Sequence, residues 1–299
     1  MRQSIEGRTI LITGPARGIG AETARQLAAR GARLSLVGLE PERLAALAAE
    51  LGPRHVWFEC DVTDQPALDR AVAGTVAALG GIDVVIANAG VASNGTVAAG
   101  PVEALVRTIE VNLVGVVRTV SATLPHVTER RGYFLLVSSA AALAAMPGIA
   151  TYAASKAGVE YFGNALRLEV AHKGVRVGVA HPSWIDTDLV RDQRAELGTF
   201  DAMLERLPGP FGRVTPVEEC AAALVAAIEG RKRKVFVPKS LAPLAAIRQL
   251  FMSPLSDWVV AREAKRTIPA IEREVATLGR AFGANSMGMG GRTPPRADR

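Results

Sequence analysis

The strongest constraint on the fold is a regular alternation between short apolar runs and Ala-rich segments with helical spacing. The apolar runs are nearly continuous, as is typical of parallel strands covered on both faces. They lie at Thr9–Thr13, Arg33–Val37, His55–Phe58, Val84–Ala87, Tyr133–Val137, Val175–Ala180 and Lys234–Val237. The helical patterns lie at 18–30, 41–51, 65–79, 102–124, 152–173 and 216–229. This order predicts an α/β fold with a doubly wound parallel sheet and right-handed crossovers.

The alternation also suggests how the chain is divided. Residues 1–238 are expected to form one domain, in which 185–214 break the alternation and are interpreted as a flap over a site. Residues 239–282 continue the helical pattern beyond the sheet and predict a C-terminal helical extension. Residues 283–299 have the composition of a disordered tail.

Charge and cysteine content narrow the class of protein. Residues 1–228 hold 21 Lys/Arg and 23 Asp/Glu, whereas residues 229–299 hold 14 and 6, so the excess positive charge lies at the C-terminal end. The two cysteines fit a reducing compartment and offer no metal-ligand spacing, so we expect no metal. The first apolar run is too short for a signal peptide, and we expect a cytoplasmic protein.

A glycine-rich turn follows the first predicted strand and opens the first predicted helix. It holds the residues that we expect to contact a dinucleotide there: Thr13, Gly14, Arg17, Gly18, Ile19 and Gly20. Three glycines let the backbone turn tightly and approach a pyrophosphate at the helix N-terminus. By itself such a cluster is also compatible with an ordinary tight turn. Its place between a strand and a helix favours the dinucleotide site.

Two further loops come after the third and fourth predicted strands. They contain Asp61-Val62 and Asn88-Ala89-Gly90. As structure alone, Asp61 could cap the next helix and the second loop could be a turn. Because the carboxyl ends of parallel strands share one edge, we expect both loops to line the same cofactor site.

The segment that starts at Tyr152 carries a Tyr and a Lys four residues apart, so both lie on one helix face. Together with the glycine turn, Asn88-Ala89-Gly90, Asn112 and Ser139, this pair resembles the short-chain dehydrogenase/reductase family over about residues 5–238. The resemblance implies a Rossmann-type fold, a nicotinamide cofactor and hydride transfer between an alcohol and a carbonyl.

The resemblance also assigns roles. It implies catalytic roles for Ser139, Tyr152, Lys156 and Asn112, with Tyr152 as general acid/base, Ser139 on the substrate oxygen and Asn112 linking Lys156 to a water chain. It places Tyr152, Lys156, Pro182 and Thr187 at the cofactor as well. Two positions depart from the family pattern, since Ala87 replaces a frequent Asn and Ser183 replaces the usual Gly after Pro182. Structural alternatives stay open: Ser139 as a turn cap and Asn112 as a buried hydrogen-bonded residue.

The chemistry of the pair supports an acid/base role. A phenol ordinarily has a pKa near ~10, and a positive charge about 4–5 Å away favours its ionised form by a few kcal/mol at an effective dielectric of about 20. Lys156 is therefore predicted to lower the pKa of Tyr152 toward working pH. Tyr161, on the same predicted helix, has no Lys four residues on and is interpreted as a packing residue.

The form of the nicotinamide cofactor is predicted from the end of the second strand. Gly38 stands where relatives that prefer NAD have an acid, and Leu39 follows it. Arg17 is a candidate for a 2′-phosphate, or else a solvated turn residue. Glu40 is a candidate for the ribose, or else a helix cap. We expect NADP to be preferred over NAD.

The main hypothesis is an NAD(P)(H)-dependent carbonyl reductase or alcohol dehydrogenase for a small hydrophobic substrate, working as a homodimer or homotetramer. His181, Trp184 and Phe200 are candidates for the substrate pocket or for local packing. The alternatives are a non-catalytic cofactor-binding protein and a membrane-peripheral protein. The apolar, basic stripe between residues 241 and 266 either docks on its own domain, forms an oligomer contact or lid, or rests on a membrane. No motif points to nucleic acid.

Overall fold

The core of the molecule is a sheet of seven parallel strands. The computed structural model describes residues 3–93, 95–207, 209–280 and 282–283. The strands are β1 (Thr9–Thr13), β2 (Arg33–Gly38), β3 (Val56–Glu59), β4 (Val84–Ala87), β5 (Tyr133–Val137), β6 (Arg176–Pro182) and β7 (Lys234–Val237). Their order is β3-β2-β1-β4-β5-β6-β7, and every neighbouring pair is parallel. The chain leaves β1 toward one edge and returns through β4 toward the other, so a ligand crevice is expected at the carboxyl ends of β1 and β4.

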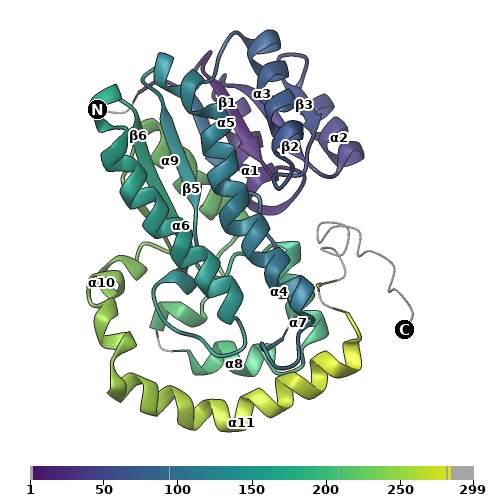
Figure 1. Cartoon of the computed structure of the whole chain (residues 1–299), viewed down its shortest axis with the longest axis vertical. Coiled ribbons are helices and arrows are strands. Elements are labelled where there is room, and N and C mark those ends of the chain that lie inside the picture. The colour runs from purple at the N-terminus through teal and green to yellow at the C-terminus, as the bar shows by residue number, and fades with distance from the viewer. Residues whose placement is uncertain (1–2, 94, 208, 281, 284–299) are drawn as a thin grey trace.

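Helices cover both faces of the sheet, as the continuous apolar strands require (Figure 1). One face packs against α1 (Gly18–Ala28), α2 (Pro41–Leu51) and α9 (Val217–Gly230). The other packs against α3 (Gln65–Leu79), α5 (Gly115–Glu129) and α6 (Ala150–Glu169), with α4 (Val102–Ile109) preceding α5. All residues of β1, β4 and β5 are buried, and the predicted doubly wound α/β fold is confirmed.

Two predicted elements differ from the structure. Strand β3 alternates between half-buried and exposed residues, because it is an edge strand; the expectation of burial on both faces is wrong there. The single helix expected over 102–124 is α4, a π-helical turn at Glu110–Val114 and α5. A single π turn shifts the hydrophobic spacing by only one residue within a long helical pattern, so the pattern still predicts one continuous helix.

Several helices lie within the predicted flap and after β7. The flap contains α7 (Asp188–Glu196), α8 (Phe200–Arg206) and a 3₁₀ turn at Gly209–Gly212. The C-terminal part contains α10 (Leu241–Ala246), a 3₁₀ turn at Arg248–Met252 and α11 (Pro254–Leu278), which runs along the outer rim of the molecule past α8 and α7 (Figure 1). The division at residue 238 stays a prediction. The tail expected from residue 283 lies, after Gly283, outside the described residues.

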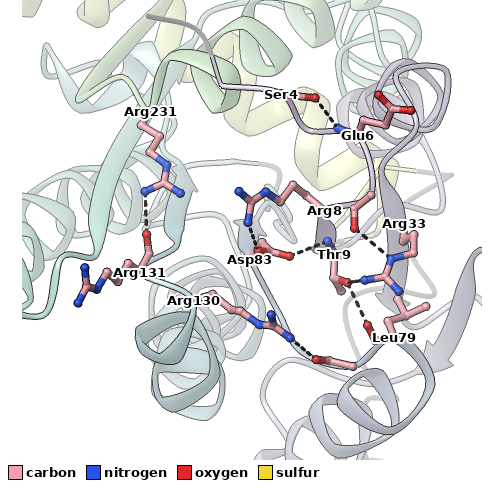
Figure 2. A network of polar contacts seen from close by, with 12 residues as sticks. Ser4, Glu6, Arg8, Thr9, Arg33, Leu79, Asp83, Arg130, Arg131 and Arg231 are labelled. Atoms are coloured by element: carbon pink, nitrogen blue, oxygen red, sulfur yellow. Dashed lines mark hydrogen bonds and ion pairs between the residues drawn. The ribbon is translucent and has the colours of Figure 1, made fainter.

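Asp83 organises the amino-terminal ends of the strands, opposite the ligand crevice (Figure 2). This residue is buried, and its carboxylate accepts hydrogen bonds from the backbone N–H of Thr9 (2.9 Å) and from Arg8 (2.7 Å). The hydroxyl of Thr9 donates to the carbonyl of Leu79 (3.3 Å) and accepts from Arg33 (3.0 Å). The carboxylate thus connects β1 to the start of β4.

Replacing Asp83 by Ala is expected to lower the free energy of unfolding by about 2–4 kcal/mol, because the N–H of Thr9 is left buried without its partner. Urea denaturation measures the change. Asp69→Ala, on the exposed side of α3, is the matched control and is expected to change stability by less than about 0.5 kcal/mol. Equal effects in the two variants would contradict the assignment.

Candidate functional site

The glycine turn after β1 lies against the loop after β4. At Gly14 the backbone has φ of +66°, and a Cβ there would stand 2.8 Å from the Cα of Ala89. A Cβ on Gly20 would stand 2.6 Å from the carbonyl oxygen of Gly14. Arg17, the N-cap residue of α1, provides no side-chain cap for that helix. Because Gly14 and Gly20 carry no side chain, the backbone of the turn lies close to the loop after β4. The same close packing leaves the first turn of α1 free for a bound pyrophosphate.

Hydrogen bonds join the two loops. The side-chain amide of Asn88 donates to the carbonyls of Thr13 (3.1 Å) and Gly14 (3.0 Å). The hydroxyl of Thr13 accepts from the backbone N–H groups of Asn88 (3.1 Å) and Ala89 (3.2 Å). Thr13 therefore holds the loops together and does not itself line the cavity.

A cavity at this edge of the sheet is lined by the predicted cofactor-binding residues, with Thr13 and Gly20 as the exceptions. It therefore brings together Gly14, Arg17, Gly18, Ile19, Asp61, Val62, Asn88, Ala89, Gly90, Tyr152, Lys156, Pro182 and Thr187. Gly20 supports the turn from below, where a side chain would also meet Asn88. The residues present fit a dinucleotide, and no cluster of metal-ligating side chains occurs within the described residues.

Tyr152 and Lys156 lie on α6 and both line the cavity. The Lys156 ammonium is buried, donates to the carbonyl of Val137 (3.1 Å) and stands 5.7 Å from the centre of the Tyr152 ring. Burial lowers the pKa of Lys156 to about 8. Burial raises the pKa of Tyr152 above its usual value, while a hydrogen bond with Ser139 acts in the opposite direction.

This electrostatic picture differs from the sequence-based expectation. The lowering of the pKa of Tyr152 by Lys156 is not the dominant effect, because the phenol is desolvated and the ammonium stands over the ring face. At neutral pH, Tyr152 is accordingly a protonated phenol and Lys156 is largely an ammonium. Both groups can therefore donate a proton.

Ser139 and its neighbour Ser138 have different roles. The hydroxyl of Ser139 accepts from the N–H of Ala141 (3.1 Å), so it caps the following 3₁₀ turn and also contacts Tyr152. The hydroxyl of Ser138 donates to the backbone carbonyl of Lys156 (2.7 Å). Ser138 thereby joins β5 to α6. This contact could not be predicted from the sequence, because a serine at the end of a strand does not indicate its partner.

Asn112 lies fully buried in the π turn between α4 and α5. Its amide oxygen accepts from the N–H of Val91 (2.8 Å), and its nitrogen donates to the carbonyl of Val91 (2.9 Å) and to Ser155 (3.1 Å). No direct bond joins it to Lys156. A Cβ on Gly90, however, would stand 3.1 Å from the Asn112 oxygen and 3.3 Å from the Lys156 nitrogen, so Gly90 leaves the space between them open.

Asp61 is positioned by an arginine that the sequence did not single out. Arg107, on α4, donates to Asp61 (2.5 Å) and to Thr63 (2.7 Å). Although burial acts the other way, hydrogen bonds from Thr63 and Arg107 lower the pKa of Asp61. An arginine on an exposed helical pattern has no local signal for this contact, because Asp61 is 46 residues away in the chain.

Arg17 stands between two carboxylates at the end of β2. It forms a bidentate ion pair with Glu40 and lies 3.6 Å from Asp188 of α7. Arg43 approaches Glu40 from α2 (3.3 Å). Thr187 also lines the cavity beside Arg17. Its methyl carbon would lie 3.2 Å from a Cβ placed on Gly18.

The three substrate-pocket candidates pack locally. Trp184 and Phe200 contact each other edge to face, with ring centres 5.3 Å apart, in a small cluster with Val190 and Leu204. His181 is fully buried and stacked on Phe236 at 4.9 Å. Tyr161, interpreted as a packing residue, is 78% exposed, and that interpretation is wrong.

Glu160 follows Lys156 by one turn of α6 and forms a buried charged cluster. It bonds Lys234 of β7 (3.1 Å) and Arg248 of the C-terminal part (2.8 Å), and lies 3.6 Å from His181. Burial opposes ionisation, but the nearby His181 side chain and the hydrogen bond from Lys234 bring the pKa of Glu160 down to about 2. Glu160 thus connects the helix of the Tyr–Lys pair to β7 and to the C-terminal segment.

Comparison with known proteins shows the family of the chain. The family model described as short chain dehydrogenase matches residues 8–198. A Mycobacterium tuberculosis protein named as an uncharacterized oxidoreductase is 35% identical over 225 residues, which are 70% of this chain and 89% of the relative. A 3-oxoacyl-[acyl-carrier-protein] reductase of Bos taurus is 32% identical (72% and 89%), and a (-)-trans-carveol dehydrogenase of Rhodococcus erythropolis is 34% identical (69% and 79%).

The chain belongs to the short-chain dehydrogenase/reductase family. It is an NAD(P)-dependent dehydrogenase or reductase. The alternative of a non-catalytic binding protein is therefore set aside.

Replacing Glu160 by Gln is expected to cost about 2–3 kcal/mol of stability at pH 7, because the lowered pKa of a buried carboxylate is a stabilising contribution. That contribution is present above the unfolded pKa near ~4.5 and is lost as the pH falls toward 2. Thermal unfolding from pH 7 to 3 should show the two proteins converging in acid. Glu50→Gln, in an exposed ion pair with Arg25, should change little at either pH. A constant gap at all pH values would contradict the prediction.

Proposed function

We propose that this protein is an NADP(H)-preferring carbonyl reductase or alcohol dehydrogenase for small hydrophobic substrates, with Tyr152 as its general acid/base. The observation that carries the proposal is the convergence of Tyr152, Ser139 and Lys156 beside the dinucleotide cavity. When bound, the nicotinamide supplies the hydride chemistry, and the protein must then supply a proton to the substrate oxygen.

The protonation states favour reduction of a carbonyl at neutral pH. The phenol of Tyr152 is protonated there, so its O–H can hydrogen-bond a carbonyl oxygen and donate the proton as negative charge develops. The hydroxyl of Ser139, bonded to that phenol, is in reach of the same oxygen and stabilises its charge. Lys156, with a pKa of about 8, remains mostly charged, and its positive charge stabilises the phenolate that forms when Tyr152 gives up its proton.

The walls of the cavity support a hydrophobic substrate. Its lining includes Val91 and Val111, and also Ile185, Leu189 and Val190 from the start of the flap region. Apolar walls bind an apolar substrate body and exclude water from the reacting atoms. We further propose a cytoplasmic homodimer or homotetramer, since α4, α5 and α6 expose the apolar side chains of Val106, Val117 and Leu168.

Replacing Tyr152 by Phe is expected to lower kcat about 10²–10⁴-fold while cofactor affinity remains close to that of the parent, because only the proton-transferring oxygen is removed. A panel of ketones and secondary alcohols, followed by nicotinamide absorbance, measures turnover, and cofactor fluorescence measures binding. Tyr161→Phe is the control on the exposed side of α6 and should keep full activity. Unchanged turnover in Tyr152→Phe would exclude this residue as the acid/base group.

The proposed preference for NADP rests on the arginines at the end of β2. Arg17 and Arg43 both approach Glu40, and a 2′-phosphate carries more negative charge than that single carboxylate. A phosphate at this place would draw the guanidinium of Arg17 away from Glu40.

Replacing Arg17 by Met is expected to weaken NADPH binding about tenfold and NADH binding much less, since only NADPH carries the phosphate that the guanidinium pairs with. Fluorescence titration of both cofactors gives the ratio. Arg25→Met, an exposed residue further along α1, serves as the control. Tighter binding of NADH than of NADPH by the parent protein would overturn the preference.

A further inference from the structure

Helix α11 is fastened to the substrate side of the molecule by three glutamates. Glu263 pairs with Arg206 of α8 (2.5 Å), Glu272 accepts from the hydroxyl of Thr96 (2.8 Å), and Glu274 accepts from that of Thr199 (2.8 Å). These partners come from the loop after β4 and from the flap. The helix is therefore a fixed part of the molecule, and its orientation determines which of its side chains are exposed to solvent.

The face that α11 turns away from the protein begins with large apolar side chains. Leu255 is 74% exposed and Trp258 is 63% exposed, and the preceding segment exposes Ile247, Leu250 and Met252 by about half or more of their surface. We call these five residues the apolar patch. Such a concentration of exposed apolar side chains in twelve residues indicates a surface that is covered in use.

Positive charge continues the same stripe. Arg262, Lys265 and Arg266 follow Trp258 by four, seven and eight residues, which places them on the same side of α11, and all three are exposed. None of the three has an ion pair within the part of the chain that the structure describes. By contrast, Arg206 and Arg248 nearby are paired with Glu263 and Glu160.

We propose that the apolar patch and these three cations dock the protein on an anionic lipid surface, with α11 lying in the plane of the interface. Trp, Leu and Met side chains enter the boundary between headgroups and acyl chains, while Arg and Lys pair with anionic headgroups. The location on the outer rim leaves α11 accessible to a flat surface (Figure 1). Within the described residues, no helix is sufficiently long and apolar to span a bilayer, so the contact is peripheral.

A lipid surface fits this stripe better than a second copy of the chain. Self-association through the same face would bring a second set of unpaired cations toward the first, and like charges disfavour that contact. Docking through α11 also brings α7 and α8, which lie behind it, close to the lipid (Figure 1). Resting on the proposed function, this arrangement places the α7 residues Leu189 and Val190, which line the cavity, near a source of hydrophobic substrate.

Co-sedimentation of the full chain with vesicles tests the proposal without cofactor or turnover, so its failure is independent of the proposed activity. We expect binding to phosphatidylcholine vesicles that contain phosphatidylserine, little binding to phosphatidylcholine alone, and weakening with added salt. The double variant Leu255→Gln/Trp258→Gln should lose about tenfold in bound fraction, as should Arg262→Gln/Lys265→Gln/Arg266→Gln. Trp57→Gln, an exposed aromatic residue on the edge strand β3, should bind like the parent.

Three outcomes would overturn the proposal. They are no binding to the anionic vesicles, equal binding by the α11 variants and the parent, and an equal loss in the Trp57→Gln control. Light scattering after size exclusion separates a further case: if Leu255→Gln/Trp258→Gln dissociates an oligomer and the parent ignores vesicles, the stripe is a subunit contact. Circular dichroism of each variant verifies that the fold is retained.

Discussion

The close approach of two backbone loops at the carboxyl ends of β1 and β4 is the constraint on which the site depends. Gly14 and Gly20 leave no room for a Cβ, and Asn88 and Thr13 bond the loops to each other. The order in which the strands are added to the parallel sheet reverses between β1 and β4. The crevice that the strand order creates thus lies beside the turn in which glycines allow the two loops to pack closely.

Burial then determines the chemistry of the crevice. It raises the pKa of Tyr152 and lowers that of Lys156 to about 8, because a low-dielectric environment disfavours the charged form of each group. Around them, Ser138 donates to the backbone carbonyl of Lys156, Asn112 bonds Ser155, and the Lys156 ammonium donates to the carbonyl of Val137. Hydrogen bonds from β5 and the π turn thus hold α6, which carries the pair, in place. Glu160 extends this positioning to β7 and the C-terminal segment.

Much of this arrangement could be predicted from local pattern. The apolar runs predicted seven strands, four with the limits of the structure and three that differ by one or two residues. Continuous burial on both faces of a parallel sheet leaves a continuous apolar sequence. The exposed side of β3 was missed, since an edge position is decided by strand order. The bonds of Arg17 to Glu40 and of Arg107 to Asp61 were missed because they join residues 23 and 46 positions apart.

The amino-acid sequence by itself determined the alternating α/β architecture, the glycine turn and the four-residue spacing of Tyr152 and Lys156, all of which depend on neighbours along the chain. Only the tertiary structure decided which charges are paired, how deeply the phenol and ammonium are desolvated, and which face of α11 remains exposed. Pairing and desolvation depend on the distances between segments in space. Those distances exist only after the sheet has assembled and the helices have packed on it.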